Sequence, residues 1–136
     1  MVGELQRKGH ILSHDRMVRL EDVSVPRPGS VFAFVMDTRP CAGAVALAKE
    51  ADLLLMEATY GSEHQELADL YLHSTAADAA DTAVRAGARR LALTHFSQRY
   101  LNVEQHLKEA GRIFSNVIVL NDLDHVEIPR SRNRSE

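Results

Sequence analysis

Apolar residues occur along this chain in short continuous runs that are separated by longer, more polar segments. The runs are residues 31–36 (VFAFVM), 52–56 (DLLLM), 90–94 (RLALT) and 116–120 (NVIVL). A short apolar run bounded by turn residues and lacking alternation is typical of a strand buried on both faces of a sheet. The pattern therefore predicts four buried strands.

The segments between these runs favour helices. The predicted helices are residues 41–51, 74–88 and 102–114. In the second of them Ser74 or Thr75 can cap the start and Gly87 suits the end. The polar segment 60–73 predicts a loop with a helical turn or two. Alternating strands and helices predict an α/β fold with a largely parallel sheet.

The two ends of the chain are less regular. Residues 4–25 predict an extended, irregular segment with short strands in HILSH and MVRLEDVSV, and the prolines and glycine of VPRPGS (25–30) interrupt regular structure. We expect one domain over residues 1–129 and a disordered tail over 130–136.

Composition narrows the classes of function. The 136 residues are 45% apolar and 26% charged, with a net charge of −3, which is typical of a globular domain and argues against non-specific nucleic-acid binding through a large basic face. The single cysteine, Cys41, excludes an internal disulfide and a cysteine-rich zinc site and fits a reducing compartment. No signal-peptide pattern begins the sequence and no apolar stretch nears about 18 residues, so we expect a cytoplasmic protein without a membrane partner.

Reactive side chains follow the carboxyl ends of the predicted strands or precede a helix, which is where parallel α/β sheets collect ligands. These residues are Asp37, Glu57, His73, Ser74, Thr75, His95, Ser97 and Arg99. They combine two carboxylates, two imidazoles, an arginine and a helix N-terminus that can hold an anion. Together they predict a site for a phosphate, and for a metal beside it.

Each of these groups also has a structural explanation. Asp37 could cap the helix that follows it, Glu57 could be a solvated loop carboxylate, and His73 or His95 could bond a backbone carbonyl. Their shared placement, more than any one of them, favours a function. The other histidines lie in polar or loop contexts without the spacing of metal ligands, and we interpret them as lying outside the site: His10, His14, His64, His106 and His125.

Four segments, DTRPC, ADLLLMEATY, HSTAADAA and LTHFSQRY, stand in the order and spacing seen in the ribonuclease Z family. Its members are tRNA 3′-processing endonucleases of the metallo-β-lactamase superfamily, and GELQRKG and NDLDHVEIP also resemble that family. The resemblance implies the C-terminal half of a metallo-β-lactamase-like αββα sandwich, with a mixed sheet covered by helices.

The resemblance also implies a role for each site residue. Asp37 resembles an aspartate that bridges two zinc ions and His95 a ligand of one of them, although manganese suits the same donors. Glu57 and His73 resemble the pair that relays a proton to the departing 3′-oxygen. The family contacts the substrate phosphate or orders the site at the positions of Ser74, Thr75, Ser97 and Arg99.

The family's main metal-binding signature, HxHxDH, does not occur in this sequence. Two protein ligands are too few for zinc, which takes three or four. The resemblance therefore implies the C-terminal portion of an endonuclease for precursor tRNA, whose site is completed by a missing N-terminal half. We expect the isolated chain to bind zinc weakly or not at all, and to cleave no tRNA.

Three other hypotheses stay open. The chain could be a non-enzymatic module that binds phosphate or RNA ends at the start of the 74–88 helix. It could be a half-domain that dimerises to cover an exposed sheet. It could also be another phosphodiesterase of the same superfamily, for example one that acts on cyclic nucleotides.

Overall fold

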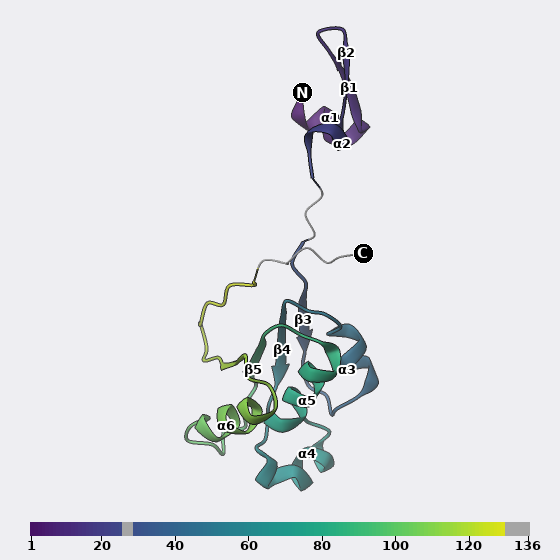
Figure 1. The fold of residues 1–136 in the computed structure, drawn as a ribbon. Coiled ribbons are helices and arrows are strands. Elements are labelled where there is room, and N and C mark those ends of the chain that lie inside the picture. Colours follow the sequence, from purple (N-terminus) through teal and green to yellow (C-terminus); the bar gives the residue numbers. More distant parts are fainter. Residues whose placement is uncertain (26–28, 130–136) are drawn as a thin grey trace. The chain divides into compact units, whose positions relative to one another are not determined.

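The computed structural model describes residues 1–25 and 29–129, which form two compact units (Figure 1). Among the described residues, the N-terminal unit holds residues 1–25 and the larger unit holds residues 29–129. The tail that we predicted to be disordered, 130–136, lies outside the described residues. The single domain that we expect over 1–129 stays a prediction.

The N-terminal unit consists of a helix, a hairpin and a short second helix. Helix α1 (Val2–Lys8) leads into strands β1 (His10–Ser13) and β2 (Arg16–Arg19), which pair antiparallel, and α2 (Leu20–Val23) follows. The two short strands agree with the sequence pattern.

Helix α1 corrects our prediction of an extended segment over residues 4–25. Lys8 Nζ lies 2.8 Å from Glu4 Oε1, one helical turn away, and Gly9 ends the helix in left-handed backbone with φ 74°. Leu5 is the only buried residue among residues 1–25. The segment therefore has no apolar periodicity from which a helix could be predicted.

The larger unit is built on a four-stranded sheet in the order β3-β4-β5-β6. Its strands are β3 (Phe32–Val35), β4 (Leu53–Glu57), β5 (Leu91–Thr94) and β6 (Val117–Val119), which confirms the four predicted strands. Each pairing in this sheet is parallel. The mixed sheet implied by the resemblance is thus parallel throughout these four strands, and antiparallel pairing in the described chain is confined to β1 and β2.

Helices connect the strands as predicted. They are α3 (Ala42–Leu47), α5 (Ala76–Ala86) and α6 (Glu104–Ile113), and α5 contacts both of the others (Figure 1). The polar segment after β4 holds the short helix η1 (Ser62–His64) and α4 (Gln65–Tyr71). No helix within residues 1–25 and 29–129 has the length and apolar character that a membrane span requires.

One face of the sheet packs against the segments that contain α3, α5 and α6. Val35, Met56, Leu93 and Val119 align across the four strands and belong to this core. The helices meet them mostly with alanine, which lets helix and sheet backbones come close: Ala44, Ala48, Ala76, Ala79, Ala80 and Ala83. The alternating side chains of β3 point to the other face, where Phe32 is 47% and Phe34 is 55% exposed.

Candidate active site

Two of the predicted site residues follow their strands in left-handed backbone. Asp37 lies two residues after β3 with φ 49°, and His95 comes directly after β5 with φ 59°. Positive φ is uncommon outside glycine, and strained residues of this kind cluster at functional sites. The two turns bring Asp37 Oδ1 to 3.3 Å from His95 Nε2.

Glu57, the last residue of β4, is completely buried. Its Oε1 accepts a hydrogen bond from the Thr38 amide. Its Oε2 accepts from the Thr59 hydroxyl at 2.6 Å and the Ser74 amide at 3.2 Å, and lies 2.9 Å from His73 Nδ1. The two oxygens of an ionised carboxylate only accept, so these four donors satisfy it. Glu57 is the residue around which the site is organised.

His73 precedes α5 and its ring is only 24% exposed. Because Glu57 accepts from Nδ1, that nitrogen carries the hydrogen and Nε2 is left with its lone pair. The same Nδ1 lies 3.9 Å from Asp37 Oδ1, and the ring centroid is 5.6 Å from that of His95. The structure therefore brings the four residues predicted for catalysis and metal binding to one end of the sheet.

Thr59 is a site residue that the sequence analysis did not single out. Its side chain is buried, and Oγ1 lies 2.9 Å from His95 Nδ1 as well as next to Glu57. The strand ladder continues beyond β4, since the Ala58 amide donates to Thr94 O at 2.9 Å. Positions i and i+2 of an extended chain share a side, which is the signal that places Thr59 with Glu57.

Asp37, His73 and His95 each offer a ligand atom, and these atoms lie within 4.8 Å of one another. Nitrogen and oxygen donors suit zinc or manganese. In the described part of the chain no other histidine, cysteine or carboxylate belongs to this group, and His73 Nδ1 is already bonded to Glu57. The residues thus fit part of a metal site rather than a complete one.

Ser74 and Thr75 are completely buried, with side chains that bond within the chain. Ser74 Oγ donates to Thr38 O at 2.7 Å, and Thr75 caps α5 in a capping box with Asp78. Several amides at this helix start are also bonded internally, namely those of Ser74, Thr75, Ala76 and Asp78. These donors are therefore engaged in ordering the site.

Ser97 and Arg99 lie on the loop after β5. The Ser97 amide donates to Thr59 O at 3.0 Å, and its half-buried hydroxyl accepts from the Arg99 amide at 3.5 Å. The exposed Arg99 guanidinium lies 5.5 Å from the centre of the Tyr60 ring. Tyr60 in turn has its ring edge-on to His73, with centroids 6.1 Å apart. Arg99 is thus an exposed cation that is connected to His73 through the Tyr60 ring.

Aromatic rings of the same loop pack against the buried imidazole of His106. Tyr100 Oη accepts from the Gly61 amide and bonds His64 Nδ1, both at 2.8 Å. His106 on α6 has polar neighbours in the sequence but is completely buried, with its ring centroid 5.2 Å from that of Phe96 and 4.5 Å from that of Tyr100. Burial lowers the pKa of His106 and raises that of Tyr100. The loop that carries His95 and Arg99 is thus held against α6 by these ring contacts.

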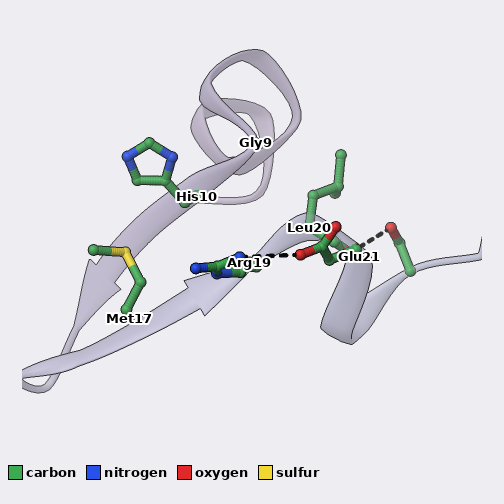
Figure 2. A pocket seen from close by; sticks show the side chains of 7 residues that line it. Gly9, His10, Met17, Arg19, Leu20 and Glu21 are labelled. Atoms are coloured by element: carbon green, nitrogen blue, oxygen red, sulfur yellow. Dashed lines mark hydrogen bonds and ion pairs between the residues drawn. The ribbon is translucent and has the colours of Figure 1, made fainter.

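A hollow of about 640 Å³ lies within the N-terminal unit (Figure 2). Its lining includes Gly9, His10, Met17, Arg19, Leu20 and Glu21. Figure 2 shows the Arg19 guanidinium directed at the Glu21 carboxylate, and the two lie 3.4 Å apart. None of the predicted site residues lines this hollow.

Known proteins with similar sequences are ribonuclease Z enzymes. The ribonuclease Z of Nocardia farcinica is 48% identical over 132 residues, which are 96% of this chain and 43% of that protein. The ribonuclease Z of Chlamydia muridarum is 47% identical over 133 residues, or 98% of this chain and 44% of that protein. No family model matches the chain. The chain spans less than half the length of the curated relatives that it matches.

Solved structures identify the fold. A metallo-β-lactamase fold protein from Bacillus subtilis superposes with a TM-score of 0.59 at 24% identity, covering 65% of this chain and 35% of that one. A long-form ribonuclease Z from yeast superposes with a TM-score of 0.55 at 31% identity, covering 65% of this chain and 12% of that one. These findings confirm the metallo-β-lactamase-like fold, and the matched sequence corresponds to the C-terminal half of ribonuclease Z.

Proposed function

We propose that this chain, whose sequence corresponds to the C-terminal half of ribonuclease Z, supplies the proton-transfer half of a metal-dependent hydrolase that cleaves precursor tRNA on its 3′ side. The observation that carries the proposal is the 2.9 Å contact between His73 Nδ1 and the fully buried Glu57. A carboxylate that accepts from one imidazole nitrogen orients the ring and raises the basicity of the other nitrogen. Such a pair suits the transfer of a proton to a leaving oxygen.

Asp37 and His95 are the residues that we propose to hold metal, with two zinc or manganese ions in the complete enzyme. Their nitrogen and oxygen donors fit these ions, and the side chains lie 3.3 Å apart at the end of the sheet. Bound metal supplies an activated water and stabilises charge on the phosphodiester. The group of three donors falls short of two metal sites, so the other ligands are proposed to come from the missing N-terminal half.

In the proposed reaction His73 moves one proton. Its Nε2, the nitrogen that is not bonded to Glu57, delivers the proton to the 3′-oxygen as the bond between phosphorus and that oxygen breaks. Nε2 takes up this proton before the step, and the Nδ1 hydrogen bond to Glu57 holds the ring in place throughout. Water supplies the oxygen that phosphorus gains, so the products are a 3′-hydroxyl and a 5′-phosphate.

The remaining predicted residues divide by their exposure. We assign phosphate contact to Arg99, because its guanidinium is exposed and is connected to His73 through the Tyr60 ring. We assign the ordering of the site to Ser74, Thr75 and Ser97, because their hydroxyls already bond within the chain.

The proposed partners are precursor tRNA, the missing N-terminal half and, for the isolated chain, a second copy of itself. The exposed side chains of Phe32 and Phe34 on β3 support a protein partner, because exposed apolar side chains are stabilised when they are covered. The exposed single thiol of Cys41 supports a reducing cytoplasm as the compartment.

Reconstitution from two halves tests the function. The chain is mixed with the N-terminal half of a ribonuclease Z, and a 3′-extended precursor tRNA is added with zinc or manganese. We expect neither half to cleave alone and the mixture to cleave. Glu57→Gln and His73→Asn should each lower the rate by about 10²–10⁴-fold, since the acid loses its proton or its orientation.

Asp81→Asn is the matched control, because Asp81 is an exposed carboxylate of α5 outside the site and should leave the rate unchanged. Cleavage by the chain alone, or an unimpaired His73→Asn mixture, would contradict the proposal. Metal-independent RNA binding that His73→Asn does not alter, without cleavage by the mixture, would support the binding-module hypothesis instead.

A further inference from the structure

The Thr59 side chain contacts both Glu57 of the proposed acid–base pair and His95, a proposed metal ligand. Its side chain is almost fully buried, and Oγ1 lies 2.6 Å from Glu57 Oε2 and 2.9 Å from His95 Nδ1. The same oxygen is 3.4 Å from His73 Nδ1. A single hydroxyl therefore joins the last residue of β4 to an imidazole that follows β5.

The hydrogen positions follow from the donor and acceptor capacity of each group. The Glu57 carboxylate only accepts, so the Thr59 hydroxyl hydrogen lies on the bond to Glu57 Oε2. A hydroxyl has one hydrogen, so Thr59 Oγ1 must accept in its contact with His95. The hydrogen of that contact therefore comes from His95 Nδ1, and Nε2 of the neutral ring keeps its lone pair.

We propose that Thr59 is a positioning residue that fixes the tautomer and the orientation of His95. Through it, Glu57 Oε2 orients both imidazoles, His73 by direct contact and His95 by way of the hydroxyl. Thr59 acts through His95 and contacts no reacting atom. The inference rests on the proposed function in one respect only, namely that the free His95 Nε2 would bind metal.

Removing the hydroxyl has a specific consequence. Without Thr59 Oγ1, the partner left to the His95 ring is Asp37 Oδ1, which lies 3.3 Å from Nε2. A carboxylate accepts hydrogen bonds, so it favours the tautomer in which Nε2 carries the hydrogen. The nitrogen that faces Asp37 then changes from an acceptor to a donor, which is the wrong state for binding a cation.

The test is ¹⁵N NMR of the imidazole rings in the full chain, with chelator present, at about pH 8, where an unperturbed imidazole is neutral. His95→Gln identifies the His95 signals by their loss. In the unmodified chain we expect His95 to be protonated at Nδ1. Thr59→Val, which keeps the shape of the side chain, should move His95 to the Nε2-protonated tautomer, and Thr59→Ser should keep the original tautomer.

Thr82→Val is the matched control, because Thr82 is a completely buried threonine of α5 outside the site. A general effect of losing a buried hydroxyl would appear in both valine variants, whereas the inference expects the His95 signals to move in Thr59→Val alone. An unchanged tautomer in folded Thr59→Val overturns the inference, and so does an equal shift in Thr82→Val.

The tautomer of His95 in the unmodified chain is a second, independent test of the inference. If Thr59→Val does not fold, an Nε2-protonated His95 in the unmodified chain overturns the inference, and an Nδ1-protonated His95 that is retained in Thr59→Ser supports it. Metal and RNA take no part in this measurement. A failure of the reconstituted mixture to cleave tRNA would therefore sink the proposed function without changing the tautomer result.

Discussion

His95 combines an exposed ring with a backbone conformation that its residue type seldom adopts. The side chain is 43% exposed and φ is 59°. A left-handed non-glycine residue costs about 1–3 kcal/mol, so this position is not optimised for stability. The same applies to Asp37, which is 72% exposed with φ 49°. At the scale of single residues, we therefore expect Asp37 and His95 to matter for the chemistry of the site and to contribute little to the stability of the fold.

His95→Asn tests this separation. Asparagine tolerates left-handed backbone well, and little apolar contact is lost at an exposed position. We expect the free energy of unfolding in urea to stay within about 0.5 kcal/mol of the unmodified chain. The two-half mixture should nevertheless lose its metal-dependent cleavage. A loss of more than about 2 kcal/mol would mean that His95 is chiefly a structural residue.

At the scale of elements, α6 supports the loop after β5 through one buried imidazole. His106 is completely buried and neither ring nitrogen has a hydrogen-bond partner within the described chain. Burial lowers the pKa of His106 below its ordinary value, and the nearby charges of Glu109 and Glu63 oppose this only in part. The folded protein therefore takes up a proton at His106 less readily than the unfolded chain does.

The pH dependence of stability follows from this difference. Above about pH 6.5 the His106 ring is neutral in both states and does not affect their balance. As the pH falls below that value the unfolded chain binds the proton first, so the unfolding free energy decreases by up to about 1.4 kcal/mol per pH unit. His106→Leu removes this pH-dependent loss. As the pH falls from neutral to 5, the free energy of unfolding in urea should therefore rise in the variant relative to the unmodified chain.

The other histidines are identical in the two proteins, so their contributions cancel in the comparison. A stability difference that stays constant over this pH range would show that His106 does not act as a buried neutral ring.

At the scale of the whole molecule, helices of the larger unit pack on the face of the sheet that carries Val35, Met56 and Leu93. Phe32 and Phe34 project from the other face at the edge strand β3. A half-exposed phenylalanine contributes little to the stability of the isolated chain but favours association. When another protein layer covers the face, the same side chain becomes part of a core.

Phe34→Ser should therefore have opposite consequences in two settings. In the isolated chain we expect less self-association by light scattering and a change in unfolding free energy below about 1 kcal/mol. In the two-half mixture the same change should weaken association of the halves by about tenfold or more, measured by calorimetry. Val84→Ser, at an equally exposed position on α5, is the control. Equal effects of the two substitutions would contradict a role for this sheet face.

Some of these features could be predicted from the sequence, and others could not, for physical reasons. The strands of the sheet were predictable because burial on both faces requires continuous apolar runs, and α5 because Thr75 and Gly87 mark its ends. Asp37, Glu57 and His95 lie at or just after strand ends, which parallel pairing brings to one edge. Helix α1 was missed because it buries only Leu5.

Two residues of the site region were hidden for a different reason. The i, i+2 spacing places Thr59 on the same side as Glu57, but its contact with His95 depends on how β4 and β5 pair, which the sequence around Thr59 does not reveal. His106 stands between polar neighbours in the sequence, and only the packing of α6 shows that its ring faces inward. In both cases the missing information is three-dimensional.

The order of strands in the sheet has a consequence for synthesis. Because β3, β4, β5 and β6 are neighbours in both the chain and the sheet, each strand leaves the ribosome after the strand that it joins, and no pairing waits for a distant segment. Residues that surround Glu57 emerge up to Ser74, whereas His95 follows some twenty residues later. At translation rates of about 5–20 residues per second, the contact between Glu57 and His73 can form a second or more before His95 exists. A nascent chain therefore passes through a stage in which Asp37, Glu57 and His73 are present and His95 is not.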